Sequence, residues 1–133
     1  EYDAWQMPQG GIHKDESPEQ AALRELKEEI GTSHVKVLAK SRNWYSYDIP
    51  SHLANKVWRG KYRGQTQKWF AMEFLGEDSA IKPSDVDKPE FSEWRWVELE
   101  LLPSLAISFK KAIYQSIAEE FAALANTLRA NNF

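Results

Sequence analysis

The chain has 133 residues, a mass of 15.4 kDa and a formal net charge of -3, a size that predicts one domain. Hydrophobic residues make up 42% and aromatic residues 13%, which excludes a disordered chain, and the net charge indicates neither a nucleic-acid coat nor a membrane surface. The chain has no Cys, so disulfides and Cys-based zinc sites are excluded, as suits a cytoplasmic protein. We expect no membrane span, because no run of about 18 apolar residues is present, and no secretory leader is visible.

The first predicted helix covers residues 18–30, after an extended segment at 1–11 that enters a Gly loop. Its apolar side is predicted to face the core. Both of its ends carry residues typical of helix boundaries: Ser17 as N-cap, Pro18 at the first helical position, Gln20 completing a capping box, and Gly31 after the last turn.

The remaining elements complete an α/β pattern. Side-chain alternation and β-prone residues predict four strands: 34–41, 42–50, 66–76 and 92–99. Loops are predicted at 51–65, which is basic, and at 77–91, which contains two prolines. A long helix is predicted near 105–128, because apolar residues recur at spacings of four and three: Ile113, Ile117, Phe121, Leu124 and Leu128.

Three glutamates, Glu25, Glu28 and Glu29, share one arc of the first helix. Glu25 and Glu29 form an i,i+4 pair of like charges, unfavourable by about 0.2–0.5 kcal/mol. They also lie near the helix C-terminus, where the dipole favours cations by about 0.3–1 kcal/mol. A solvated acidic face is one explanation. We favour a metal platform, because Mg²⁺ prefers carboxylate oxygens and would offset the repulsion.

The spacing of these residues resembles the Nudix box. Gly10 is followed after five residues by Glu16, and after seven more by Arg24, Glu25, Leu26, Lys27, Glu28, Glu29, Ile30 and Gly31. Every fixed position of the box, which covers residues 10–32 here, is matched through Gly31. Only Thr32 departs, since an aliphatic residue is usual there, and that position concerns packing rather than chemistry.

The resemblance extends along nearly the whole chain to one Nudix branch, the bacterial RNA pyrophosphohydrolases and related dinucleoside polyphosphate hydrolases of the invasion-associated type. It is carried by the segments "WQMPQGGI", "RNW", "QKWF", "PEFSEWRWV" and "SFKKAIY". It implies one Nudix domain over residues 1–133, an α/β/α sandwich with a mixed sheet. Only nine residues precede Gly10, so we expect the first strands of the family's sheet to be missing from the chain.

The resemblance also implies site residues. Mg²⁺ or Mn²⁺ is expected at Glu25, Glu28, Glu29 and Glu90, with Gly10 allowing close approach of the backbone. One of these glutamates is expected to act as general base. Supporting roles in the box are expected for Arg24, which can pair with Glu28 one turn later, and for Glu16 and Gly31. An ordinary loop acid is the alternative for Glu90.

Substrate contacts are expected from cations and aromatic residues. Lys61, Arg63 and Lys68 belong to a basic stretch that either forms a solvated loop or clamps phosphates. Trp44, Tyr47 and Phe109 are candidates to stack a base, although most aromatic residues are core. Lys110 is a candidate phosphate contact, and Gln67 lies in the matched segment "QKWF".

These expectations describe a metal-dependent hydrolase of nucleoside polyphosphates. The leading substrate is 5′-triphosphorylated RNA, and the close alternative is a dinucleoside polyphosphate such as diadenosine tetraphosphate. A third possibility is a catalytically silent Nudix domain that binds nucleotide or RNA, which the intact box argues against. The sequence indicates no membrane partner and no protein partner.

Overall fold

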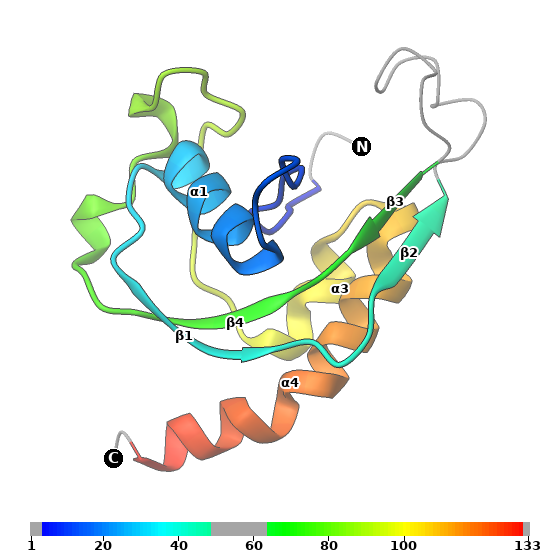
Figure 1. Cartoon of the computed structure of the whole chain (residues 1–133). Helices are drawn as coiled ribbons and strands as arrows, with labels where there is room; N and C mark the ends of the chain where they lie inside the picture. The colour runs from blue at the N-terminus through cyan, green and yellow to red at the C-terminus, as the bar shows by residue number, and fades with distance from the viewer. Residues whose placement is uncertain (1–3, 49–63, 132–133) are drawn as a thin grey trace. The chain divides into compact units, whose positions relative to one another are not determined.

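The computed structural model describes residues 4–48 and 64–131, drawn in colour in Figure 1. These residues form two compact units. The α1 unit contains residues 7–40 and 70–96. The α4 unit contains residues 4–6, 41–48, 64–69 and 97–131. In the described ranges, no helix is both long enough and apolar enough to cross a membrane.

The α1 unit is organised around helix α1, Pro18–Ile30, as predicted. The Ser17 hydroxyl accepts the backbone N–H of Gln20, and the Gln20 side chain accepts the N–H of Ser17, which completes the predicted capping box. Gly31 has a φ of 89° and donates its N–H to the carbonyl of Lys27. Glycine ends the helix there because it adopts this left-handed conformation without steric cost.

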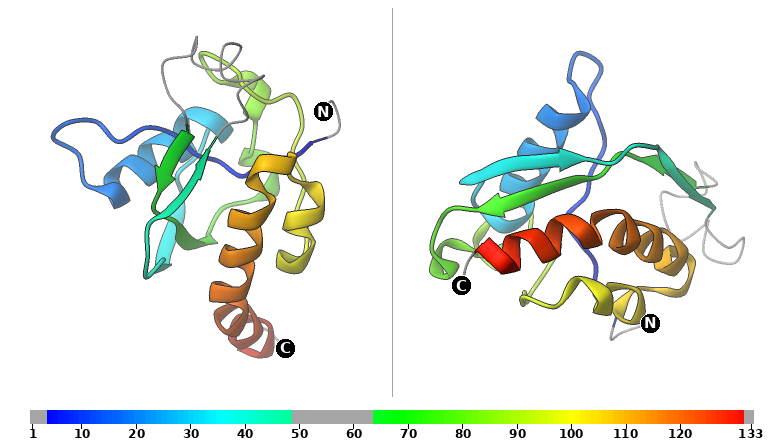
Figure 2. Two further views of the ribbon diagram at one scale, coloured as in Figure 1. Left: turned by 90° about the vertical axis from the view of Figure 1, so that its right-hand side faces the viewer. Right: turned by 90° about the horizontal axis from the view of Figure 1, so that it is seen from below.

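Two antiparallel strands complete the α1 unit. Strand β1, Val35–Lys40, pairs with β4, Phe70–Phe74, and the two run side by side in Figures 1 and 2. The register shifts between Val37 and Ala39. The predicted strand at 34–41 is confirmed. The segment after β4 contains two single 3-10 turns, Asp78–Ala80 and Pro83–Asp85, and the Lys82 N–H donates to the carbonyl of Ile30 at the end of α1.

Among the described residues, most of the buried apolar side chains lie in the α4 unit. Strand β2, Tyr45–Asp48, pairs antiparallel with β3, Gly64–Gln67. Short helix α3, Leu102–Leu105, packs against α4, Lys111–Asn131, and the two lie together in Figure 2. One face of α4 is buried in the core of this unit: Ile113, Tyr114, Ile117, Ala118 and Phe121. Trp69 meets Tyr114 edge to face, with ring centroids 5.9 Å apart.

The predicted strand at 66–76 is wrong as one element, because it is divided into β3 and β4 at Lys68 and Trp69. Trp69 donates its N–H to the Ser41 hydroxyl and accepts the Ser41 N–H. These bonds lie between β3, which pairs with β2, and β4, which pairs with β1. The predicted loop at 51–65 is also wrong at Gly64 and Gln65, which begin β3. The predicted strand at 42–50 is shortened to β2 within the described residues.

The predicted strand at 92–99 is wrong. Residues 92–98 form no helix or strand, and a 3-10 turn begins at Leu99. The Trp96 indole instead donates to Asp78, and its ring contacts Phe74 and Trp94. A strand needs a neighbouring backbone to accept its hydrogen bonds, and the part of the chain that is described supplies none to this segment.

The long C-terminal helix begins later than predicted. Ala106 and Ile107 are extended, so they separate α3 from the 3-10 turn Ser108–Lys110 that leads into α4. The prediction of a helix near 105–128 is therefore correct for its body and wrong for its first turns. The apolar spacing within the helix could not locate its start, because Ala106 is buried like the helix face that follows.

Candidate active site

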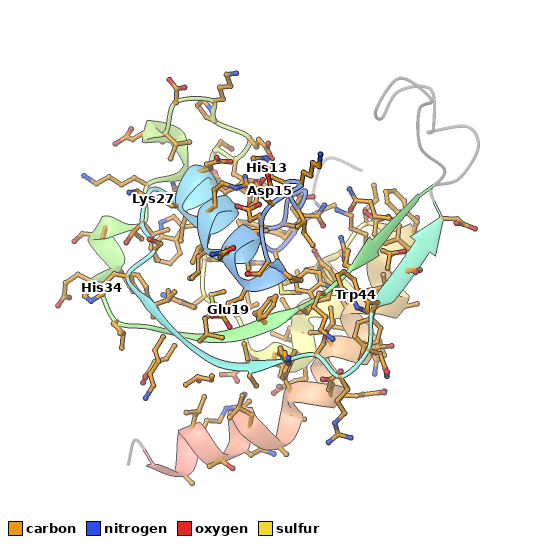
Figure 3. The ribbon with its side chains drawn as sticks, viewed as in Figure 1. His13, Asp15, Glu19, Lys27, His34 and Trp44 are labelled. Carbon is orange, nitrogen blue, oxygen red and sulfur yellow. The ribbon has the colours of Figure 1, made fainter. Side chains whose placement is uncertain are left out.

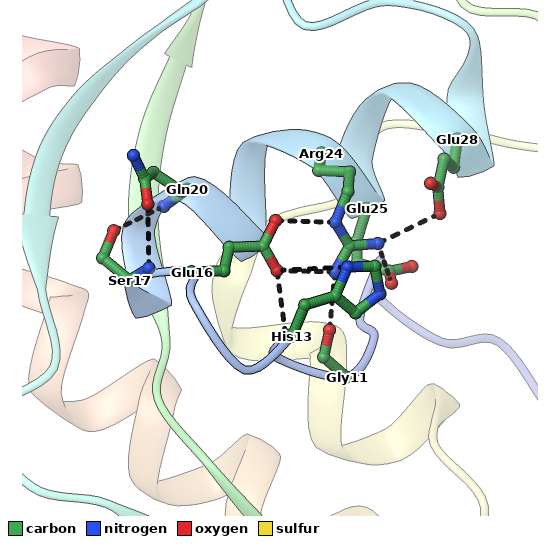
Figure 4. A network of polar contacts seen from close by, with 8 residues as sticks. All are labelled: Gly11, His13, Glu16, Ser17, Gln20, Arg24, Glu25 and Glu28. Carbon is green, nitrogen blue, oxygen red and sulfur yellow. Dashed lines mark hydrogen bonds and ion pairs between the residues drawn. The ribbon is translucent and has the colours of Figure 1, made fainter.

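Arg24 is the centre of a polar network on α1, shown in Figure 4. Its guanidinium donates to both oxygens of Glu16, at 2.7 and 2.9 Å, and to the Gly11 carbonyl at 2.6 Å. It also pairs with Glu25 at 2.6 Å and with Glu28 at 3.3 Å. One arginine therefore fastens the loop before the helix to two of its glutamates.

Glu16 links the loop before α1 to Arg24. It accepts the backbone N–H of His13 at 3.0 Å in addition to the bonds from Arg24. The bonds from Arg24 and then that of His13 lower the pKa of Glu16 from 4.5 to about 2. The same ion pairs raise the pKa of Arg24. Both groups are therefore charged at neutral pH, and the loop is tied to α1 electrostatically.

Gly10 lies directly against Glu25. An ideal Cβ on Gly10 would lie 1.9 Å from Cδ of Glu25 and 2.1 Å from its Oε2. A Cβ on Gly11 would meet no atom within 4 Å. With Glu25 in this conformation, position 10 has no room for a side chain and requires glycine. Position 11 has room for one.

Glu29 is a buried carboxyl surrounded by other acids. Only 4% of the residue is exposed, and it accepts the backbone N–H of Gln9 at 3.0 Å. Burial raises the pKa of Glu29 to about 8; the Gln9 bond acts in the opposite direction, and the charges of Glu90, Glu25 and Glu28 add to the rise. Glu90 itself is exposed. The α1 unit thus brings the four predicted glutamates into electrostatic contact.

Most of the predicted substrate-binding residues lie in the α4 unit. The ring centroids of Tyr47 and Phe109 are 5.6 Å apart, and the Lys110 ammonium is 6.0 Å from the centroid of Tyr47. Lys110 is only 8% exposed and donates to Gln6 at 3.3 Å. Tyr47 is also buried, so its ring already packs against protein side chains. Lys61 and Arg63 lie outside the described residues.

Gln67, the last residue of β3, and Lys68, which follows it, have different environments. Gln67 donates to Gln65 at 3.1 Å and accepts the indole N–H of Trp69 at 3.0 Å. Gln65 in turn accepts the hydroxyl of Tyr47 at 2.9 Å. Lys68 lies instead near Trp44, with its ammonium 5.7 Å from a ring centroid. Gln67 is therefore linked to Tyr47 through Gln65, whereas Lys68 contacts Trp44.

The model of the NUDIX domain matches residues 1–119 of the chain. The chain belongs to the Nudix family. Curated relatives named RNA pyrophosphohydrolase include those of Wolbachia sp. subsp. Drosophila simulans (strain wRi), 51% identical, and Rickettsia bellii (strain OSU 85-389), 50% identical. The first match covers 90% of this Nudix chain and the second 91%, and each covers 74% of the relative. The relative from Gluconacetobacter diazotrophicus is 48% identical, over 89% of this chain and 71% of that protein.

The Nudix fold is also found in a solved structure that resembles this one. The E. coli dihydroneopterin triphosphate pyrophosphohydrolase superposes with a TM-score of 0.62, covering 90% of this chain and 77% of that chain. At 22% identity this similarity shows the fold alone. The predicted family and the predicted α/β Nudix fold class are therefore confirmed.

Nudix hydrolases generally use divalent metal ions, and the chemistry of the donors here fits such an ion. Carboxylate oxygens are the ligands that hard divalent cations prefer, and the repulsion around buried Glu29 is what a cation would relieve. In the described ranges, however, no three His, Asp or Glu side chains are arranged as a metal-ligand set. Arg24 pairs with two of the four glutamates instead.

Three residues near these clusters were not predicted from the sequence. Gln9 bonds Glu29 through its backbone N–H, which every residue except proline provides, so its side chain carried no signal. Gln6 accepts from Lys110, over 104 positions along the chain, and only the fold reveals that pairing. Gln65 was detectable in principle, because residues i and i+2 of a strand share a face and Gln67 was already a candidate.

Proposed function

We propose that this Nudix protein hydrolyses 5′-triphosphorylated RNA to 5′-monophosphorylated RNA and releases pyrophosphate. The observation that carries the proposal is the Nudix box with all its glutamates, in a chain 48–51% identical to proteins named RNA pyrophosphohydrolase. Water supplies the new oxygen of the RNA product: its oxygen forms a bond to the α-phosphorus and its proton passes to a base. The bond from the α-phosphorus to the α,β-bridging oxygen breaks, and that oxygen leaves as part of pyrophosphate.

The α1 unit supports the chemical step. A triphosphate is anionic and repels an attacking water, so a catalyst must neutralise charge. We propose Glu25, Glu28, Glu29 and Glu90 as ligands of Mg²⁺ or Mn²⁺, which when bound would stabilise charge on the phosphate oxygens. Because Arg24 holds Glu25 and Glu28 in this structure, it positions those carboxylates through its ion pairs.

The attacking water must lose a proton, and the candidates are one of the box glutamates or Glu90. Glu29 has support from its environment, since it is buried and burial raises its pKa, which makes its carboxylate a stronger base. Its bond from the Gln9 N–H fixes the carboxyl group while leaving oxygen lone pairs for another partner. Glu90 is exposed and interacts electrostatically with Glu29, so it stays a candidate.

The α4 unit supports recognition of the RNA. Tyr47, Phe109 and Lys110 form one cluster, which combines aromatic rings with a positive charge. Aromatic rings stack with any base, and lysine binds phosphate as a point charge. We propose that Phe109, the half-exposed ring of this cluster, and Gln67 contact the first nucleotides, and that Tyr47 and Lys110, which are buried, support that ring. We propose that Lys61 and Arg63 add positive charge beside the RNA backbone. We also propose that the reaction takes place in the cytoplasm, where RNA is made in bacteria.

Turnover on two substrates tests this proposal. The full chain would be assayed with 5′-triphosphorylated RNA and with diadenosine tetraphosphate, each with Mg²⁺, with Mn²⁺ and with excess chelator. We expect pyrophosphate from the RNA, a lower kcat/KM for the dinucleotide, and no turnover in chelator. A higher kcat/KM for the dinucleotide would favour the dinucleoside polyphosphate hydrolase instead. Binding of either substrate without turnover would indicate a silent Nudix domain.

A further inference from the structure

Trp44 is a large aromatic residue that stands on the surface of the α4 unit. It is 50% exposed, in the turn that leads into β2, and it is labelled in Figure 3. The ammonium of Lys68 lies over its ring, 5.7 Å from a centroid, and donates to the Arg42 carbonyl at 3.4 Å. Residues 42, 44 and 68, from two separate segments, thus form one surface, which we call the Trp44 platform.

The segments under the Trp44 platform are fastened together by a buried serine. Ser41 has no exposed surface; it donates its N–H to Trp69 at 2.7 Å and accepts the Trp69 N–H at 3.1 Å. Its hydroxyl also donates to the Asn43 carbonyl at 2.9 Å. The backbone on both sides of the platform is therefore held before any ligand arrives, which lowers the entropic cost of binding.

The charge of the Trp44 platform is positive. Neither Arg42 nor Lys68 forms an ion pair with any residue in the described ranges. Glu120 is the acid that faces this turn, and its two oxygens accept the backbone N–H of Arg42 and the hydroxyl of Tyr45. An aromatic ring with the Lys68 ammonium 5.7 Å from a centroid, and with Arg42 two residues away along the chain, matches a base and its phosphates.

A protein partner fits this surface less well. Protein interfaces are built on contiguous apolar patches with few charges at the centre. In the described part of the α4 unit, Trp44 and Leu101 are the large hydrophobic residues that stand exposed, and Leu101 belongs to a different segment. The described neighbour that borders the Trp44 ring is the Lys68 ammonium, not another large exposed apolar residue.

We propose that the Trp44 platform binds the single-stranded body of an RNA, with one base stacked on Trp44 and the adjoining phosphates held by Lys68 and Arg42. This rests on the proposed function and extends it, because it adds a contact to the RNA chain beyond the 5′ triphosphate. Single strands offer unstacked bases, whereas bases in a duplex are covered by their neighbours. The platform therefore selects single-stranded substrate.

Direct binding tests the platform without turnover. The full chain in excess chelator would be titrated into a 3′-labelled single-stranded oligoribonucleotide of about eight nucleotides, read by fluorescence polarisation. We expect Trp44→Ala to weaken binding by about tenfold, since it removes the ring on which one base stacks. Trp44→Phe should restore most of the affinity. Lys68→Ala should weaken binding and reduce its salt dependence.

Lys36→Ala is the matched control for loss of one positive charge, because Lys36 is exposed on β1 in the α1 unit. It should bind as the parent does. Equal affinities for the parent and Trp44→Ala, or a loss as large in Lys36→Ala as in Lys68→Ala, would overturn the platform. Equal affinity for an RNA duplex of the same length would also overturn it, since stacking on Trp44 requires an uncovered base. The turnover assay on triphosphorylated RNA decides the proposed function separately.

Discussion

The carboxylate of Glu25 occupies the space that a side chain at Gly10 would need, 1.9 Å from Cδ to an ideal Cβ. Arg24 holds the same carboxylate from its other side at 2.6 Å. The conformation of one candidate metal ligand is thus set jointly by a glycine in the preceding loop and by an arginine on its own helix.

Gly10→Ala should therefore displace Glu25 more than it destabilises the fold. The added methyl group collides with a flexible side chain, and the ion pair it disturbs is partly exposed, so the free energy of unfolding should fall by about 1 kcal/mol or less. Turnover should fall by about tenfold or more if Glu25 is a ligand. Gly11→Ala is the control, since its Cβ meets nothing within 4 Å. If Gly10→Ala keeps the turnover of the parent, Glu25 has no catalytic or metal-binding role.

Glu16→Gln should change how stability depends on pH. The pKa of Glu16 is lowered from 4.5 to about 2, first by the bond from Arg24, so the ionised group stabilises the fold above about pH 4.5. This contribution is lost as pH falls towards 2. The melting temperature of Glu16→Gln should thus lie below that of the parent at neutral pH, and the difference should shrink in acid. A difference that is constant from neutral to acid pH would contradict this account.

Glu29→Gln should preserve the fold and abolish most activity. Glutamine is nearly isosteric and can still accept the Gln9 N–H, and it removes the cost of ionising a buried carboxyl group beside other acids. Turnover should fall by about a hundredfold or more, the size of effect expected for a general base. Glu28→Gln should also lose activity with little loss of stability. Glu19→Gln, on the exposed first turn of α1, is the control. A variant that melts earlier yet keeps parental turnover would make its glutamate structural.

Glu90→Gln tests whether the exposed loop acid belongs to the reaction. If it is a ligand or base, kcat should fall by about a hundredfold on RNA and on diadenosine tetraphosphate alike, because both need the same activated water. Glu93→Gln, three residues later and also exposed, is the control. Rates close to the parent on both substrates would leave Glu90 as an ordinary loop acid.

Local sequence was enough to place helix α1 and its caps. Ser17, Gln20 and Gly31 act on backbone groups within a few residues, so their roles can be recognised without knowing the rest of the fold. The same is true of the glutamate spacing, since the period of the helix alone puts Glu25 and Glu29 on one arc. The family follows from this window and is confirmed along the chain.

Tertiary structure decided the features that depend on distant partners. Residues 92–99 look like a strand from their side chains, yet no neighbouring backbone in the described ranges pairs with them. Ser41 bonds to Trp69, and this pairing coincides with the break in a segment whose sequence predicts one continuous strand. The burial that raises the pKa of Glu29, and the Gln9 N–H that opposes this rise from 20 positions away in the chain, likewise depend on the fold. Hydrogen bonding between strands and desolvation are properties of neighbours in space, which the local pattern of side chains does not specify.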